Sequence, residues 1–277
     1  MFDQVIVPLD GSEESARALR PASAIAHYLD IEMSVVAFHP STNDGHQLSE
    51  AVCEQVDTIG VVDRNIRVTP VGQSIPEALI SALSDYPRPI VVMATRGHGR
   101  TAALVGSVAN QVLAQTGAPV LLIGPACDIS RFRLHGPMIV AADSSDHSRD
   151  VIELAATMTT AFDFVPSVVN VLGPSTSQKL NKARSGGDGH HVPEDSMLAH
   201  RYAIDLGEAV GRRDIDYRVL HDRDPASAIV KQAIDADATL ITMATRARSG
   251  IKRLALGSVA ASVIGNAPCP VLAVAPG

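Results

Sequence analysis

Short, continuous apolar runs alternate along the chain with longer segments in which apolar residues recur at helical spacing. In the first half, the apolar runs predict strands over roughly 4–9, 32–38, 66–71, 89–94 and 119–123. The segments between them predict helices over roughly 13–29, 47–62, 75–85 and 107–116. Apolar runs of this kind are typical of strands buried on both faces of a parallel sheet. The regular alternation therefore predicts an α/β fold built from right-handed crossovers.

The second half of the chain repeats the first. Four blocks recur in the same order: VIVPLDGSEESARAL (5–19) with MIVAADSSDHSRDVI (138–152), IPEALISAL (75–83) with DPASAIVKQ (224–232), IVVMATRGHGR (90–100) with LITMATRARSG (240–250), and GSVANQVLAQTGAPVLLIGP (106–125) with GSVAASVIGNAPCPVLAVAP (257–276). Most of the residues added in the second copy fall within 173–197, a polar stretch with several Gly that predicts a loop. The blocks predict two domains, 1–125 and 137–277, joined by a linker over 126–136.

Composition narrows the class of protein. Among the 277 residues, 46% are apolar and only 3% aromatic, and small aliphatic side chains suit a sheet covered by helices on both faces. The net charge of −7 argues against a nucleic-acid partner, because such proteins carry basic surfaces. No apolar run approaches the roughly 20 residues of a membrane-spanning helix, and the start lacks the features of a signal peptide. We therefore expect a cytoplasmic protein with no membrane partner.

The sequence offers few candidates for a metal site or for catalysis. Cys53, Cys127 and Cys269 are widely spaced, so they predict neither a disulfide framework nor a zinc site. Two adjacent histidines, 190–191, lack the spacing of known metal sites and are more typical of a polar loop. Carboxylates recur at the end of the first strand of each copy, but no His, Lys or second carboxylate recurs in register with them. We therefore assign no catalytic residue and no metal ligand.

Two loops of each copy carry the candidate binding chemistry, because ligands of open α/β sheets bind beyond the carboxyl ends of the strands. The loop after the first strand is acidic, with Asp10-Gly11-Ser12 in one copy and Asp143-Ser144-Ser145 in the other, and could accept hydrogen bonds from a base or ribose. The loop after the fourth strand carries Arg and ends in Gly-Ser at a helix start, where free N–H groups favour an anion. The alternative is that Gly-Ser only begins a helix and that the arginines are solvated.

Lysine is absent from the first 178 residues. This excludes a Walker-type P-loop there, because that motif needs a phosphate-binding Lys. Any phosphate bound by the first copy must therefore be held by backbone N–H groups, Ser107 and Arg.

The whole chain resembles a tandem universal stress protein. The resemblance rests on the VIVPLDGSEESARAL opening, the MATRGHGR…GSVA segment and the APVLLIGP ending, each of which is present twice. It implies two Rossmann-like (adenine nucleotide alpha hydrolase-like) domains, each a five-stranded parallel sheet of order 3-2-1-4-5 with helices on both faces. It further implies that the fifth strands pair the two domains as an internal pseudo-dimer, and that a homodimer could form through the same edges.

The resemblance also implies a cofactor, ATP or another adenine nucleotide, with Mg²⁺ as a possible companion. In the ATP-binding branch of that family, the Asp that ends strand one contacts the nucleoside, a residue that ends strand two lines the adenine pocket, and a glycine motif after strand four holds the phosphates. By position, the implied cofactor-binding residues are Pro8, Asp10, Phe38, Ala94, Gly97, Gly106 and Ser107 in the first copy, and Ala141, Asp143, Val171, Ala244, Ala247, Gly257 and Ser258 in the second.

Both copies depart from the glycine motif, which reads Gly, two residues, Gly, nine residues, Gly-Ser/Thr. The first copy has Ala94 at its first position and one residue too few between Gly97 and Gly106. The second copy keeps the spacing but has Ala244 and Ala247 in place of glycine. Three functions therefore remain open: a nucleotide-binding stress protein without strong catalysis, an interaction module that has lost ATP binding, and a slow ATPase that uses Asp10 or Asp143.

Overall fold

The computed structural model describes residues 1–40, 45–60, 65–72, 74–96, 105–143, 148–173, 194–245 and 256–275. In the first copy, the strands are β1 (Gln4–Leu9), β2 (Glu32–Pro40), β3 (Asn65–Val71), β4 (Pro89–Ala94) and β5 (Val120–Ile123). The helices are α1 (Glu13–Ala16), α2 (Leu19–Leu29), α3 (His46–Thr58), α4 (Ile75–Leu83) and α5 (Ser107–Gln115). The strands and helices expected from the apolar pattern are therefore confirmed, apart from the first helix and the end of α3, which stops at Thr58 just before Gly60 with its positive φ.

The second copy has the same arrangement. Its strands are β6 (His135–Ala141), β7 (Asp163–Leu172), β8 (Asp216–His221), β9 (Leu240–Ala244) and β10 (Val271–Val274). Its helices are α6 (Ser148–Ala161), α8 (Glu194–Val210), α9 (Pro225–Asp235) and α10 (Ser258–Asn266). A short 3₁₀ helix, Ile129–Arg131, lies between the copies, and β6 begins at His135, inside the segment expected to be linker. The last two residues of that segment, His135 and Gly136, pair with β7.

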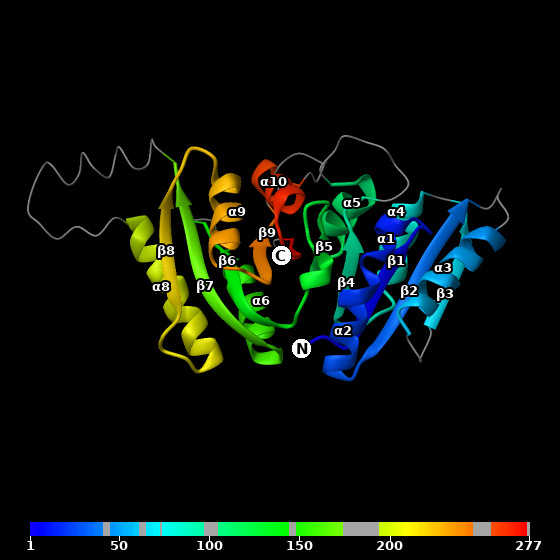
Figure 1. Ribbon diagram of the computed structural model, residues 1–277, viewed down its shortest axis with the longest axis horizontal. Helices are drawn as coiled ribbons and strands as arrows, with labels where there is room; N and C mark the ends of the chain where they lie inside the picture. Colours follow the sequence, from blue (N-terminus) through cyan, green and yellow to red (C-terminus); the bar gives the residue numbers. More distant parts are fainter. Residues whose placement is uncertain are drawn as a thin grey trace, which may run out of the picture.

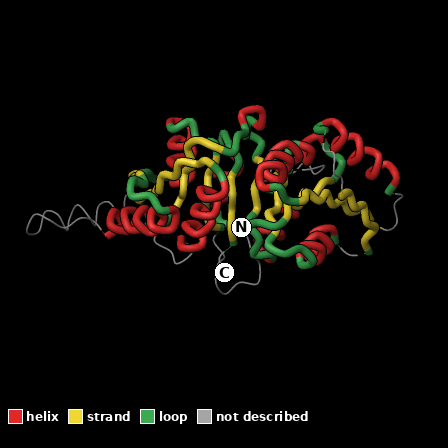
Figure 2. The backbone as a smooth tube through the Cα atoms, turned by 90° about the horizontal axis from the view of Figure 1, so that it is seen from below, coloured by secondary structure: helices red, strands yellow, loops and turns green. Residues whose placement is uncertain are grey.

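All ten strands form one sheet, in the order β3-β2-β1-β4-β5-β10-β9-β6-β7-β8. Each half is parallel and has the expected order 3-2-1-4-5. Figure 1 shows the two halves side by side, and Figure 2 shows helices on both sides of the strands. One face packs against α2, α3, α6 and α8, and the other against α4, α5, α9 and α10.

The two copies meet at β5 and β10, which pair antiparallel (Figure 1). Leu121 lies opposite Leu272, and these two residues also occupy the same position in the sequence repeat. A pseudo-twofold axis therefore passes through this pair, and the expected pairing of the fifth strands is present within one chain. Because β5 lies between β4 and β10, and β10 between β5 and β9, neither strand has a free edge. A homodimer through these edges, the other expectation, does not agree with this structure.

The helix predicted over 13–29 is two helices. The amides of Arg17 and Ala18 bond to carbonyls three residues back, at Glu14 and Ser15, so the first helix closes in a tight turn. Pro21 has no N–H to donate to a carbonyl four residues earlier. It is tolerated only in the first turn of a helix, and α2 starts two residues before it, at Leu19.

No helix in the part of the chain that the structure describes is long and apolar enough to cross a bilayer.

Candidate functional site

The loop after β1 is a tight turn held by Asp10. Its Oδ1 accepts hydrogen bonds from the amide of Ser12 at 3.0 Å and from the Ser12 hydroxyl at 2.5 Å. The Ser12 hydroxyl in turn accepts from the amide of Ser15 at 3.1 Å and caps α1. Gly11 has φ +79°, a conformation that favours glycine, and its carbonyl accepts from the side chain of Gln55 on α3. Asp10 thus has a structural role in this turn.

In the second copy, the described part of the matching turn is held by Ser148, the repeat counterpart of Ser15. The hydroxyl of Ser148 donates to the carbonyl of Asp143 at 2.7 Å and accepts from its amide at 2.9 Å. The side chain of Asn170 on β7 donates to the carbonyl of Ala142, the residue before Asp143, at 3.0 Å. Its Oδ1 is buried and has no partner among the described residues.

The helix start after β4 is fixed to the end of that strand. The amide of Gly106 donates to the carbonyl of Thr95 at 2.7 Å, and the amide of Thr95 donates to the carbonyl of Ile123 on β5. Gly106 has φ −68°, but a Cβ on it would lie 2.9 Å from the Thr95 carbonyl oxygen. A glycine is therefore needed here for packing, whether or not a phosphate approaches.

Three buried polar atoms around this helix start have no hydrogen-bond partner among the described residues. They are Oγ1 of Thr95, Nε of Arg96 and Oδ1 of Asn110. Thr95 is only 2% exposed, and Asn110 uses its Nδ2 to hold the carbonyl of Val105 at 3.2 Å. Such an unpaired group costs about 1–3 kcal/mol. Neither the glycine motif nor composition points to these atoms, although Thr95 recurs as Thr245 in the repeat.

Two of these three groups have no unpartnered counterpart in the second copy, and the counterpart of the third, Arg246, lies outside the described residues. The hydroxyl of Thr245 bonds to the carbonyl of Val274 at 3.4 Å, and Ala261 stands at the repeat position of Asn110. Both α5 and α10 have a glycine as the N-cap residue, Gly106 or Gly257, and so lack a side-chain cap. The two helix starts are therefore alike in their backbone and differ in the polar side chains around them.

The described residues of the expected site lie along the carboxyl edges of the two half-sheets. β1 lies between β2 and β4, so the strand ends that carry Pro8, Phe38 and Ala94 are neighbours, as are their counterparts on β6, β7 and β9. Phe38 and Val171 are half-buried on the faces covered by α4, α5, α9 and α10, and Pro8, Ala141 and Ala244 are also half-buried. Ser107 and Ser258 are exposed at their helix starts.

Gly97 and Ala247 lie outside the described residues, as do His190 and His191. Among the residues that are described, no group of three or more His, Cys, Asp or Glu could hold a metal ion.

The sequence profile of the universal stress protein family matches this chain twice, over residues 1–124 and 136–275. This chain belongs to the universal stress protein family. A universal stress protein of Methanocaldococcus jannaschii is 52% identical over 50 residues, 18% of this chain and 29% of that relative. A putative universal stress protein of Staphylococcus aureus is 26% identical over 140 residues, 50% of this chain and 82% of the relative. The chain thus spans less than a third of the length of the first relative.

Solved structures share the whole tandem fold. A universal stress protein from Archaeoglobus fulgidus superposes with a TM-score of 0.64 at 18% identity and covers 99% of both chains. A putative universal stress protein from Pseudomonas aeruginosa has the same TM-score at 14% identity and covers 99% of this chain and 94% of its own. At such identities, the likeness establishes the fold of this universal stress protein and nothing about its ligand.

Two of the three thiols lie at the junction of the copies. Cys127 and Cys269 are 4% and 6% exposed, and Cys53 is half-buried. Burial raises the pKa of the Cys127 thiol to about 11 and that of Cys269 to about 12, the latter with a contribution from the neighbouring Cys127. Thiolates are the reactive form of cysteine, so both thiols are inert at neutral pH.

At pH 8, Ellman's reagent is expected to modify Cys53 and to spare Cys127 and Cys269 until the protein unfolds. Because unfolded thiols ionise near their ordinary pKa of 9.0 and the folded ones only near 11 and 12, the unfolded state loses protons first. The free energy of unfolding should therefore fall as the pH rises above 9. The Cys127→Ala/Cys269→Ala variant should show less of this fall. Rapid reaction of more than one thiol in the native protein would contradict the prediction.

Proposed function

We propose that this universal stress protein binds ATP at the carboxyl edge of its first copy and acts in the stress response through this binding. The observation that carries the proposal is the set of buried, unpartnered polar atoms beside the uncapped start of α5. A polar ligand that pairs with these atoms would recover their desolvation cost. The second copy, which lacks two of the three groups, is not the proposed site.

The chemistry of these three unpartnered atoms suits a nucleoside triphosphate. The Nε–H of Arg96 and the hydroxyl of Thr95 can donate to phosphate oxygens, and the first-turn amides of α5 add donors at the positive end of the helix dipole. Oδ1 of Asn110 is an acceptor, which suits a ribose hydroxyl or the hydration shell of an accompanying Mg²⁺. On this proposal, no lysine of the first copy takes part, in keeping with the absence of Lys from residues 1–178.

A second candidate is an interaction module that no longer binds ATP. It is favoured by the structural roles of two motif residues: Asp10 holds its own turn, and Gly106 packs against Thr95. Both residue types are explained without a ligand. The two candidates differ in whether the unpartnered atoms at the end of β4 ever acquire a partner.

Thr95→Val is expected to lower the affinity for ATP by about tenfold or more, because a hydrogen bond to a charged group contributes about 1.5–3 kcal/mol. Without ATP, the same variant should have the same free energy of unfolding as the wild type or a higher one, since the hydroxyl has no partner among the described residues. Isothermal titration calorimetry measures the first quantity, and thermal unfolding with and without ATP the second.

The matched control is Thr245→Val in the second copy. Its hydroxyl is already bonded to Val274, so this change should cost some stability and leave ATP affinity unchanged. GTP in place of ATP reports on the selectivity for adenine. If the wild type shows neither heat nor a shift in its unfolding midpoint with about 1 mM ATP, the nucleotide proposal fails and the interaction module stands.

A further inference from the structure

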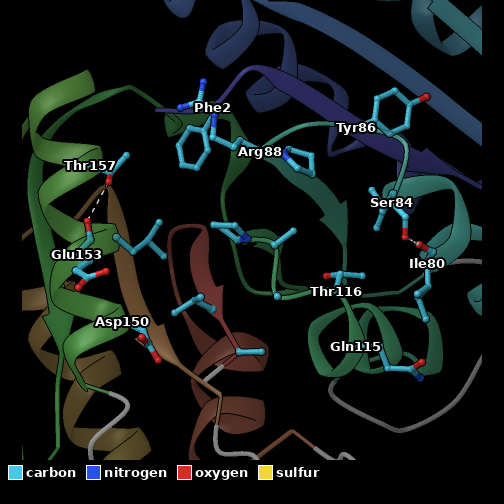
Figure 3. Close-up of a pocket in the computed structure, with 18 of the residues that line it drawn as sticks. Phe2, Ile80, Ser84, Tyr86, Arg88, Gln115, Thr116, Asp150, Glu153 and Thr157 are labelled. Carbon is cyan, nitrogen blue, oxygen red and sulfur yellow. Dashed lines mark hydrogen bonds between the residues drawn. The ribbon is translucent and has the colours of Figure 1, made fainter. Parts of the chain in front are cut away.

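A cavity of about 660 Å³ lies between the amino-terminal edge of the first copy and helix α6 of the second (Figure 3). We call it the amino-edge groove. On one side, Ser84, Gln115 and Thr116 come from the first copy; on the other, Asp150 and Glu153 come from α6. Its volume is within the range of about 300–1,000 Å³ that is usual for ligand sites. It lies on the opposite edge of the first copy from Asp10 and Gly106.

The sequence repeat identifies the equivalent place in the second copy. Ser84, Pro89 and the run Gly117–Pro119 of the groove match Ala233, Thr239 and Pro268–Pro270, which line a much smaller cavity of about 80 Å³. That cavity is small because residues of the connecting segment form its remaining wall: Asp128, Arg131, Phe132 and Arg133. The fold therefore contains one groove twice, once filled by its own chain and once open.

The filled groove shows how the connecting segment, which includes the 3₁₀ helix Ile129–Arg131, is held there. The amide of Asp128 donates to the carbonyl of Pro268 at 3.1 Å. Nη2 of Arg17, at the junction of α1 and α2, donates to the carbonyl of Cys127 at 2.6 Å. Ion pairs join Arg131 and Arg133 to Asp237, the second at 3.1 Å. The segment is thus held by a backbone hydrogen bond, by the guanidinium of Arg17 and by ion pairs to Asp237.

The open groove has the opposite charge on its helix wall. In the repeat, Asp150 stands at the position of Arg17, and Glu153 at that of Arg20. Both acidic residues line the groove, and Glu153 is exposed. Arg88, the residue with positive φ that matches Asp237, is already bound by Asp3 through two hydrogen bonds of 2.7 and 2.8 Å. The α6 wall of the groove is therefore acidic, while Met1 and the paired Arg88 line the other side.

We propose that the amino-edge groove binds a short, basic segment of a partner protein, in the manner in which the second copy holds residues 126–134. The carbonyl of Gly117 matches that of Pro268 and would accept a backbone N–H of the segment. A Lys or Arg side chain of the segment would pair with Asp150 and Glu153. In the filled groove, the equivalent position is taken by Arg17, which instead binds the carbonyl of Cys127. The proposal does not depend on nucleotide binding.

The test uses two fluorescein-labelled peptides and the full-length protein under reducing conditions. Both peptides have the sequence of residues 125–134, PACDISRFRL, with the first two positions replaced by Lys in the basic probe and by Glu in the acidic probe. Fluorescence anisotropy is expected to show that the wild type binds the basic probe at least about tenfold tighter, with an affinity that falls as salt is added.

The double variant Asp150→Arg/Glu153→Arg should lose this preference. Asp205→Arg/Glu208→Arg on α8 changes the net charge by the same amount, on residues with the same spacing and away from the groove, and should keep it. Ala118→Trp, which fills the groove without changing charge, should also abolish binding of the basic probe. Thermal unfolding confirms that each variant is folded.

Three results would overturn the proposal. One is equal affinity of the wild type for both probes, or no binding of either up to about 1 mM. Another is an equal loss in the control variant on α8, which would show general charge attraction. The third is self-association of the protein without peptide that Asp150→Arg/Glu153→Arg abolishes, which would make a second copy of the chain the occupant.

Discussion

Gly124→Ala is expected to lower the free energy of unfolding by about 2–3 kcal/mol, although it adds a single methyl group. Gly124 directly follows β5, and a Cβ on it would lie far inside van der Waals distance of the carbonyl oxygen of Ile264 on α10. Gly124 is not among the glycines with positive φ, so the cost comes from this contact and not from backbone strain. Since the contact is with backbone, relief requires α10 to move relative to β5.

The control is Gly72→Ala, because a Cβ at Gly72 meets no atom of the described residues within 4 Å. Its effect on stability should stay within about 0.5 kcal/mol. Guanidinium unfolding followed by circular dichroism measures both variants. A wild-type unfolding midpoint for Gly124→Ala would show that the junction between the copies yields at little cost, and that the two halves are less tightly coupled than the packing indicates.

Most of the fold follows from the apolar pattern and the repeat. Strands β1, β2, β3, β4 and β5 lie within two residues of the predicted ranges, because fully buried parallel strands leave a strong local signal. The break at Arg17 was missed because the apolar period continues through it, while the lost N–H of Pro21 decides where the second helix starts. The strand order came from the resemblance, since no local pattern encodes which strands are neighbours.

The candidate site could be predicted only in part. The loops that carry Asp10 and Gly106 are placed correctly at the carboxyl edge, because the topology rule of parallel sheets fixes their position. What these residues do there could not be predicted, since it depends on Ser12 and Thr95 as hydrogen-bond partners. Whether Asn110 keeps an unpaired oxygen depends on everything around it in three dimensions, which a sequence motif does not contain.

The tandem arrangement gives the two copies different surroundings. In a homodimer built by the same strand pairing, the two subunits would have identical sheet edges, each with the same surroundings. In this chain, the connecting segment fills the amino edge of one copy and leaves the other open. The carboxyl edges also differ, with Asn110 in the first copy and Ala261 in the second. Joining two domains in one chain therefore lets each pair of equivalent sites diverge, and this supports separate roles for the two copies.

Leu121→Ala and Leu272→Ala are each expected to lower the free energy of unfolding by about 3 kcal/mol, within the range of about 2–5 kcal/mol for buried Leu→Ala changes. The two residues are 1% and 0% exposed and face each other in the β5–β10 ladder. Either single variant already loses the contact between the two side chains, so the double variant cannot lose it a second time. The double variant should therefore cost about 0.5–1 kcal/mol less than the sum of the single variants.

Leu79→Ala provides the comparison, because Leu79 lies on the buried face of α4, is fully buried and is away from the junction. It should cost as much as Leu121→Ala by itself and add fully to Leu272→Ala. Guanidinium unfolding of the single and double variants measures both sums. Non-additivity confined to the Leu121–Leu272 pair would show that the two halves share one core at the pseudo-twofold axis. Additivity for both pairs would instead mean that each half is stabilised separately, and that the continuous sheet contributes little coupling between the copies.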